Sequence, residues 1–323
     1  MSQTQSTRPT PKLHGPGGLV QTHWTVVPHW VNQLVGTSNS EGRDLSISTN
    51  RHWALLTGVI ENADALDDKD LQQATADLYT GLLDRLGQTP APHPVRAWNL
   101  VPTIHRTERP GQDRYMAFNA GRHAAYRNWF GEDARMAKTM PTASAVGCPG
   151  RDLIVHLLGH HQPGQAIENP RQVPAFRYSK RFGDLPPSFV RATRLTQVDS
   201  ASWVLVAGTA SVVGEVSRHP GDLTAQLNET FRNLATVMLQ AANDPRPING
   251  HLSSHEREAL RGYRTARVYT RRPEDLARIS QAVTRTMPNC ESIELVRADI
   301  CRPELLVEIE GTGVLPHGRW THD

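Results

Sequence analysis

Hydrophobic side chains recur at helical spacing in two long segments of the chain, residues 68–86 and residues 221–239. The first stripe consists of Leu71, Ala74, Leu78 and Leu82, and the second of Leu223, Leu227, Phe231, Leu234 and Met238. Gly87 follows the first stripe, where it is expected to form the C-cap. The pattern therefore predicts one long amphipathic helix in each half of the chain.

The segments after each long helix predict the same further elements in the same order. In the first half these are 95–104 (strand), 118–130 (helix) and 147–159 (turn and strand). In the second half they are 264–270 (strand), 272–283 (helix, with Pro273 in its first turn) and 298–311 (turn and strand). Each half thus offers a hairpin, helix, strand, helix and strand, which predicts an α+β fold with helices on one sheet face.

The two halves end in closely similar segments. Cys148 is followed by PGRDLIVHLLG, and Cys301 is followed by RPELLVEIEG. We infer an internal duplication with a boundary near residue 165, and chance similarity of two αβ units is the alternative. The predicted organisation is a flexible polar lead over 1–18, one domain over 19–165 and a second over 166–323.

The last predicted strand carries acidic side chains on one face. The alternating residues expected to meet the helices are Leu305, Val307 and Ile309. Glu308 would then face away from the helices, where another sheet or subunit must cover it, and His156 is its expected counterpart in the first half. Burial there would raise the pKa of Glu308, which suits a general acid.

Composition and charge exclude several classes of protein. The chain has 323 residues and a formal charge of only +3, and no basic run interleaved with aromatics predicts a nucleic-acid partner. No segment approaches the ~18 apolar residues of a membrane helix, and the polar N-terminal segment lacks the apolar core of a signal peptide. Three widely spaced cysteines predict no disulfide framework, so a cytoplasmic protein is expected.

The histidines of HLLGHH, which are His156, His160 and His161, are a weak candidate for a zinc site. The segment lacks the glutamate of the metalloprotease signature, and it is expected to form a strand and turn. We therefore expect neither a metal nor a cofactor.

Arginine and tyrosine side chains gather in residues 114–131 and 170–193. Tyr115 and Arg122 lie in the first segment, and Tyr178 and Arg181 lie in the second. Guanidinium groups pair with carboxylates in a bidentate manner, so these residues could clamp an anionic small molecule. A solvated linker and structural salt bridges are the alternative interpretation.

Five motifs resemble those of the chorismatases, in the same order along residues 95–311. They are FNAGRHAAY, PRQVPAFRYSKRFGDLPPSF, GTASVVGEVSRHPGDLTAQLNETFRNL, VYTRRPEDL and ADICRPELLVEIEG. The second half separately resembles the trimeric RidA-type imine deaminases, in which Glu308 matches the family's acidic residue. Ile293 stands where those deaminases place an arginine, which weakens a deaminase function.

The resemblance implies two RidA/YjgF-like (chorismate mutase-like) units and a small-molecule substrate, chorismate. It implies that Glu308 protonates the enolpyruvyl ether, and that Cys301 marks the branch of the family that forms 3-hydroxybenzoate and pyruvate. Ala210 or Gly214 would leave room for the substrate ring. The oligomeric state, a homotrimer or a monomer, stays open.

Three other functions stay open at this point. One is hydrolysis of chorismate to 3,4-dihydroxycyclohexa-1,5-diene carboxylate and pyruvate. Another is the same chemistry on 4-amino-4-deoxychorismate. The third is a RidA-like ligand-binding protein that has lost catalysis.

Overall fold

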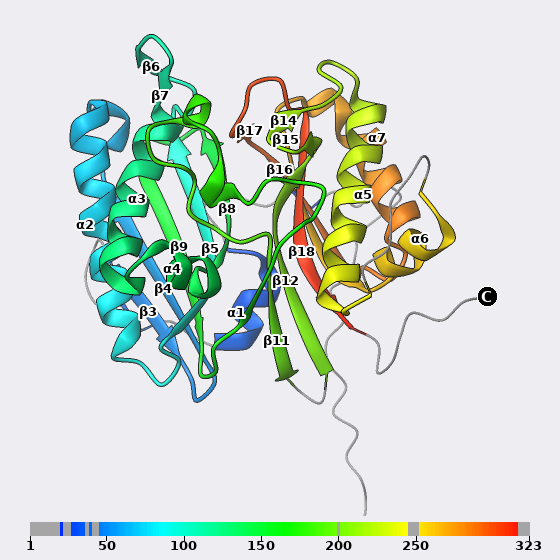
Figure 1. Cartoon of the computed structure of the whole chain (residues 1–323), viewed down its shortest axis with the longest axis horizontal. Coiled ribbons are helices and arrows are strands. Elements are labelled where there is room, and N and C mark those ends of the chain that lie inside the picture. Colours follow the sequence, from blue (N-terminus) through cyan, green and yellow to red (C-terminus); the bar gives the residue numbers. More distant parts are fainter. Residues whose placement is uncertain are drawn as a thin grey trace, which may run out of the picture.

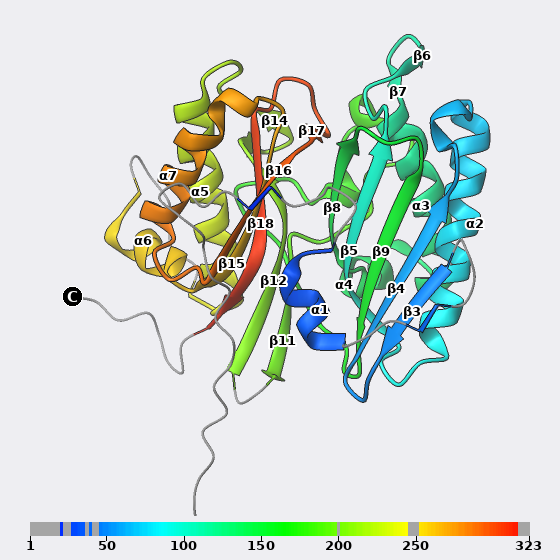
Figure 2. The ribbon, with the colours of Figure 1, turned by 180° about the vertical axis from the view of Figure 1, so that it is seen from behind.

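Two seven-stranded sheets face each other, and helices cover the outer face of each sheet (Figure 1). The computed structural model describes residues 20–21, 27–35, 39–40, 45–198, 201–244 and 252–315, so the predicted lead over 1–18 lies outside the described residues. The outer helices are α2 (Asp68–Gly87) and α3 (Arg114–Phe130) on one side, and α5 (Leu223–Ala241) and α7 (Leu276–Thr286) on the other. Figure 2 shows the short helix α1 (His29–Val35) between the two sheets.

The strands of each sheet come mainly from one half of the chain. The N-terminal sheet has the order β17 (Asp299–Ile300), β8 (Thr142–Cys148), β5 (His93–Pro102), β9 (Leu153–His160), β4 (Trp53–Ile60), β3 (Leu45–Thr49) and β2 (Asn39–Ser40). The C-terminal sheet has the order β1 (Val20–Gln21), β16 (Ser292–Arg297), β15 (Tyr263–Thr270), β18 (Val307–Val314), β12 (Ala201–Ala210), β11 (Ala192–Val198) and β10 (Gln165–Ile167). The edge strands β1 and β17 are exchanged, because each pairs with the sheet of the other half.

The remaining elements are short. They are α4 (Asp133–Thr139), α6 (Ser254–Leu260), the hairpins β6 (Thr107–Arg109)–β7 (Gln112–Asp113) and β13 (Val212–Val213)–β14 (Val216–Ser217), and 3-10 turns at Ala63–Ala65, Ala175–Arg177, Lys180–Phe182 and Pro273–Asp275.

The two halves have the same topology, which confirms the predicted α+β class with two duplicated RidA/YjgF-like units. In the first half β8 is parallel to β5, and β5, β9 and β4 are successively antiparallel. In the second half β16, β15, β18 and β12 repeat this pattern. The registers match as well, because His156 lies opposite Trp98 and Glu308 lies opposite Tyr269. His156 is therefore the counterpart of Glu308. The domain boundary near residue 165 remains our proposal.

The predicted element order lacked one strand in each half, β8 and β16. Every residue of β8 is buried, so its small side chains show no alternation of apolar and polar positions. The position of the C-cap was also wrong, because Gly87 is the last residue of α2 and Gln88 forms the cap. Gly87 has a packing role instead, since a Cβ there would lie 2.9 Å from a ring carbon of Trp129.

The predicted face of the last strand is correct only from Val307 onward. Val307 and Ile309 pack in the core beneath α5 and α7, as expected. Leu305 instead lies in a turn before β18, where its N–H donates to the carbonyl of Arg302, and it packs beside Ala210. The alternation fails at this residue because the strand has not yet begun.

Candidate active site

A cavity of about 300 Å³ lies where the start of α3 and the loop 172–191 meet the ends of β12 and β18. Its wall combines three carboxyl groups (Asp113, Glu304 and Glu308), a thiol, phenols and guanidinium groups with apolar side chains. A small-molecule site has this volume and this mixture of polar and apolar groups. The cavity includes six of the eight predicted site residues, which are Glu308, Cys301, Tyr115, Tyr178, Arg181 and Ala210.

Glu308 lies on β18 with its side chain facing away from the helices, as predicted. Its neighbours in register are Ala210 of β12 and Tyr269 of β15, and it is 4% exposed. Burial, together with the nearby carboxylate of Glu310, raises the pKa of Glu308 to about 8 against the opposing charges of Arg96 and Arg191. Glu308 is therefore protonated at neutral pH and can donate a proton into the cavity.

A β-bulge in β12 makes room for the carboxyl group of Glu308. The register between β12 and β18 shifts between Val206 and Thr209. The N–H of Gly208, inside the bulge, donates to Ser144 Oγ of β8 at 2.8 Å. A Cβ on Gly208 would lie 2.0 Å from Oε1 of Glu308, so a glycine is needed for this close approach.

Cys301 lines the same cavity as Glu308 and packs in a small apolar cluster with Ala210, Val212 and Leu305. Burial raises the pKa of the Cys301 thiol to about 12, and the neighbouring Glu308 contributes in the same direction. The thiol is therefore neutral at physiological pH. A neutral thiol is a poor nucleophile, and what it adds to the wall is its size and polarisability.

Three arginines line the cavity. Arg191 is 6% exposed, and its Nη2 donates to the hydroxyl of Tyr178 at 2.7 Å. Arg302 lies 4.2 Å from the ring centroid of Phe182 and donates to the carbonyl of Glu215 at 2.9 Å. Arg181 is exposed and lies 4.8 Å from the same ring of Phe182. Aromatic faces thus hold the guanidinium groups toward the cavity, where they could bind carboxylates.

Two of the predicted residues do not line the cavity. Arg122 is buried behind the wall, with its guanidinium carbon 5.1 Å from the ring centroid of Phe118 and 6.0 Å from that of Phe189. Gly214 lies in the turn between β13 and β14 with a φ of 61°, and its N–H and carbonyl bond to the backbone of residues 171 and 173. This glycine is required by the turn conformation rather than by a ligand.

Two cavity arginines, Arg191 and Arg302, were not among the predicted site residues. Arg191 belonged to the arginine-rich segment 170–193, but only the folded loop shows that it reaches the cavity. Arg302 directly follows Cys301, and this proximity was the available signal.

The histidine segment forms a strand and a bend, as predicted. His156 and His160 lie on β9, and His161 follows it. Across the described ranges, no group of three or more His, Cys, Asp or Glu side chains is arranged to hold a metal ion. The described helices include none with the length and hydropathy needed to span a membrane.

Comparisons with known proteins place these features in a family. The family model for the N-terminal domain of FkbO/Hyg5-like chorismatases matches residues 30–159. The 3-hydroxybenzoate synthase of Streptomyces hygroscopicus is 33% identical over 247 residues, which cover 74% of this chain and 68% of the relative. A chorismatase of Streptomyces rapamycinicus is 32% identical over 246 residues, covering 73% and 69% of the two chains.

A crystal structure of a chorismatase at 1.08 Å resolution matches with a TM-score of 0.71 and 27% identity. The match covers 86% of this chain and 80% of that chain. The chain belongs to the chorismatase family.

Proposed function

We propose that this protein is a chorismatase that converts chorismate into 3-hydroxybenzoate and pyruvate. The observation that carries the proposal is a protonated carboxyl group, Glu308, that faces a cavity lined by three arginines. Chorismate is a dicarboxylate with an acid-labile enolpyruvyl ether, so it needs both an acid and a clamp for its carboxylates. Related proteins named 3-hydroxybenzoate synthase and chorismatase support this substrate.

Glu308 would donate its proton to the methylene carbon of the enolpyruvyl group, which generates an oxocarbenium ion. The resulting Glu308 carboxylate stays next to the cation and stabilises it electrostatically. Arg181, Arg191 and Arg302 would bind the two carboxylates of the substrate, and Tyr115 and Tyr178 would add hydroxyl contacts. Arg122, behind the wall, would support the clamp through Phe118 and Phe189 without touching the substrate.

The ring hydroxyl on C4 would then attack the oxocarbenium carbon and lose its proton, which gives a cyclic ketal. The bond from this carbon to the C3 oxygen and the bond from C4 to its oxygen then break, so pyruvate leaves with the C4 oxygen. Loss of the C3 proton aromatises the ring, one released proton returns to Glu308, and the other goes to the C3 oxygen of 3-hydroxybenzoate. Chorismate divides in this way into 3-hydroxybenzoate and pyruvate without consuming water. If water attacks instead, the products are pyruvate and the non-aromatic diol. Cys301 and Ala210 lie next to Glu308 in the cavity wall, where they would favour the internal attack by limiting the access of water.

We also propose a cytoplasmic location, because the three cysteines are all free thiols, as in a reducing compartment. The substrate is a small molecule, and the proposed units are residues 19–165 and 166–323 around the shared cavity. The oligomeric state, a homotrimer or a monomer, is open to measurement by light scattering.

Incubation of the purified protein with chorismate, followed by chromatography, tests the function. The expected result is equimolar pyruvate and 3-hydroxybenzoate. Pyruvate with the diol would replace the proposed product branch, and turnover restricted to 4-amino-4-deoxychorismate would replace the proposed substrate. Binding of chorismate without any pyruvate would indicate a ligand-binding protein and contradict the proposal.

A further inference from the structure

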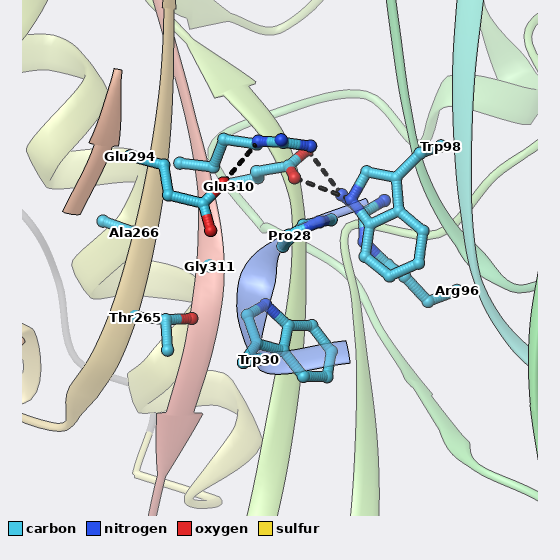
Figure 3. Close-up of a pocket in the computed structure, with 10 residues that line it drawn as sticks. Pro28, Trp30, Arg96, Trp98, Thr265, Ala266, Glu294, Glu310 and Gly311 are labelled. Carbon is cyan, nitrogen blue, oxygen red and sulfur yellow. Dashed lines mark hydrogen bonds and ion pairs between the residues drawn. The ribbon is translucent and has the colours of Figure 1, made fainter. Parts of the chain in front are cut away.

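Glu310 links the two sheets next to the general acid. It is 2% exposed and accepts hydrogen bonds from Arg96 Nη2 at 2.7 Å, from Trp98 Nε1 at 2.7 Å and from Ser144 Oγ. All three donors belong to β5 and β8 of the N-terminal sheet. Figure 3 shows the carboxylate of Glu310 directed across the gap toward Trp98 and Arg96. A carboxylate that accepts three hydrogen bonds, one of them from a guanidinium, is ionised.

Glu310 is coupled to Glu308 in two ways. The two residues lie on the same face of β18, about 6.6 Å apart along the strand, so the negative charge of Glu310 acts directly on Glu308. Ser144 provides the second link, because it bonds both Glu310 and the N–H of Gly208, which packs against the carboxyl group of Glu308. Charge and packing therefore connect the N-terminal sheet to the acid.

We propose that Glu310 is a positioning residue: its charge on the same face of β18 adds to the effect of burial on Glu308, and its hydrogen bond to Ser144 fixes the Glu308 carboxyl through Gly208. The inference rests on the proposed function of Glu308 as a general acid. Glu310 does not line the cavity, so it acts through Glu308 rather than on the substrate.

Other groups that face Glu308 are Arg96 on β5, Arg191 before β11, Tyr269 on β15, Tyr115 on α3 and Cys301 after β17. Burial raises the pKa values of Tyr115, Tyr269 and Cys301, so these groups are neutral when Glu308 titrates. The charges that act on Glu308 are therefore those of Glu310, Arg96 and Arg191. Of these, only Glu310 favours the protonated acid, and the two cations oppose it.

The substitution Glu310→Gln tests the inference because it removes the charge and keeps the size. In the wild-type enzyme, turnover should fall above a pH near 8 as Glu308 loses its proton. In Glu310→Gln this basic limb of the pH–rate profile should move down by about one to two pH units, as expected for a unit charge ~6.6 Å away at an effective dielectric constant of about 20.

Glu294→Gln is the matched control. Glu294 is 5% exposed and forms an ion pair of 2.9 Å with Arg267, so its loss disturbs a buried pair of the same kind. It is not among the charged groups that act on Glu308. The variant should lower stability and leave the basic limb in place. Two results would overturn the inference. One is an equal displacement of the basic limb of the pH–rate profile in both variants. The other is a basic limb that stays in place in Glu310→Gln while turnover falls at every pH.

Arg96→Gln provides a second test, in which the expected displacement has the opposite sign. This test remains available if Glu310→Gln does not fold. Loss of this cation should move the basic limb upward, and an unmoved limb would again overturn the inference. Titration of the Glu308 carboxyl by carbon-13 NMR, assigned by its absence in Glu308→Gln, reports the same displacements without turnover. A displaced NMR titration in a protein that releases no pyruvate would contradict only the proposed function. Pyruvate release with an unmoved limb would contradict only the role of Glu310.

Discussion

The two halves of the molecule place different side chains at equivalent positions of the same fold. In the N-terminal sheet His156 lies opposite Thr57, and a hydrogen bond of 2.7 Å joins its Nδ1 to Thr57 Oγ1. In the C-terminal sheet Glu308 lies opposite Ala210, whose small side chain leaves the carboxyl group open to the cavity. Both residues are buried, at 6% and 4% exposure. Because the two side chains are almost equally buried, burial does not explain the difference between them. The difference lies in the neighbour across the strand: Thr57 bonds His156, whereas Ala210 leaves the carboxyl group of Glu308 open to the cavity.

The residues two positions further along the strands differ in the same sense. Leu158 of β9 packs in an apolar cluster with Trp98 and Leu205, whereas its counterpart Glu310 of β18 is an anion bonded to the other sheet. The duplication supplied two copies of the scaffold. In this account only the C-terminal copy combines an acid, a neighbouring anion and an open cavity wall.

The largest effect is expected for Glu308→Gln, which keeps the size of the side chain and removes the acidic proton. General acid catalysis contributes ~10²–10⁴-fold, so turnover should fall by that amount while the fold persists. Steady-state pyruvate release and circular dichroism measure both. His156→Gln, the equivalent change in the other half, should keep wild-type turnover. Comparable losses in the two variants would refute the distinction between the halves.

Exchange of the neighbouring residues sharpens the comparison. The variant Ala210→Thr gives Glu308 a hydroxyl neighbour across the strand, as Thr57 is for His156. The new hydroxyl should bond the carboxyl group of Glu308, and the larger side chain should occupy space needed by the substrate. A misplacement of about 1 Å costs ~10²-fold in rate, so turnover should fall by roughly that factor. Thr57→Ala should leave turnover unchanged and cost ~1 kcal/mol of unfolding free energy, as measured by denaturant titration. Full activity of Ala210→Thr would show that the space beside Glu308 is not used.

A smaller effect is expected for the carboxylate clamp. Arg181→Ala removes a charge-assisted contact worth ~1.5–3 kcal/mol, so KM should rise about ten- to a hundredfold with the same products. Arg191→Ala should raise KM in the same range, and Arg122→Ala should raise it less because this residue lies behind the wall. Arg51→Ala, at an exposed position of the N-terminal half, is the control. An unchanged KM in both Arg181→Ala and Arg191→Ala would remove the clamp assignment.

The smallest effect on rate is expected for Cys301→Val, which should still release pyruvate because the acid is intact. The ratio of 3-hydroxybenzoate to diol should decrease, since the altered wall lets water compete with the ring hydroxyl. Cys148→Val, at the equivalent cysteine of the first half, should keep the wild-type ratio, as read by chromatography. If Cys301→Val also keeps it, Cys301 is only a packing residue.

The features predictable from the sequence were those with a local period. The alternation in β18 correctly placed Glu308 on the face between the sheets, and the apolar stripes located α2 and α5. The strand β8 was missed because burial on both faces removes any alternation. Ser144, which bonds Glu310 and the N–H of Gly208, lies on that strand.

The residues of the cavity wall depend on contacts between distant segments. The loop 172–191 brings Arg191 to the cavity, and the carbonyl of Arg191 accepts the N–H of Ala207 in the β-bulge at 2.9 Å. No local pattern indicates such a contact, so Arg122 and Arg191 could not be distinguished by sequence alone. The bulge likewise brings Gly208 and Ala210, rather than Gly214, to the cavity.

The pH dependence of kcat tests the central claim, that Glu308 works as a neutral acid, most directly. Burial and Glu310 raise the pKa of Glu308 to about 8, so the active, protonated form is present below that pH. With chorismate at saturation, kcat for pyruvate release should be constant from about pH 6 to 7 and fall tenfold per pH unit well above 8. A kcat that rises with pH through this range would mean that the ionised carboxylate is the active form, and would contradict the account.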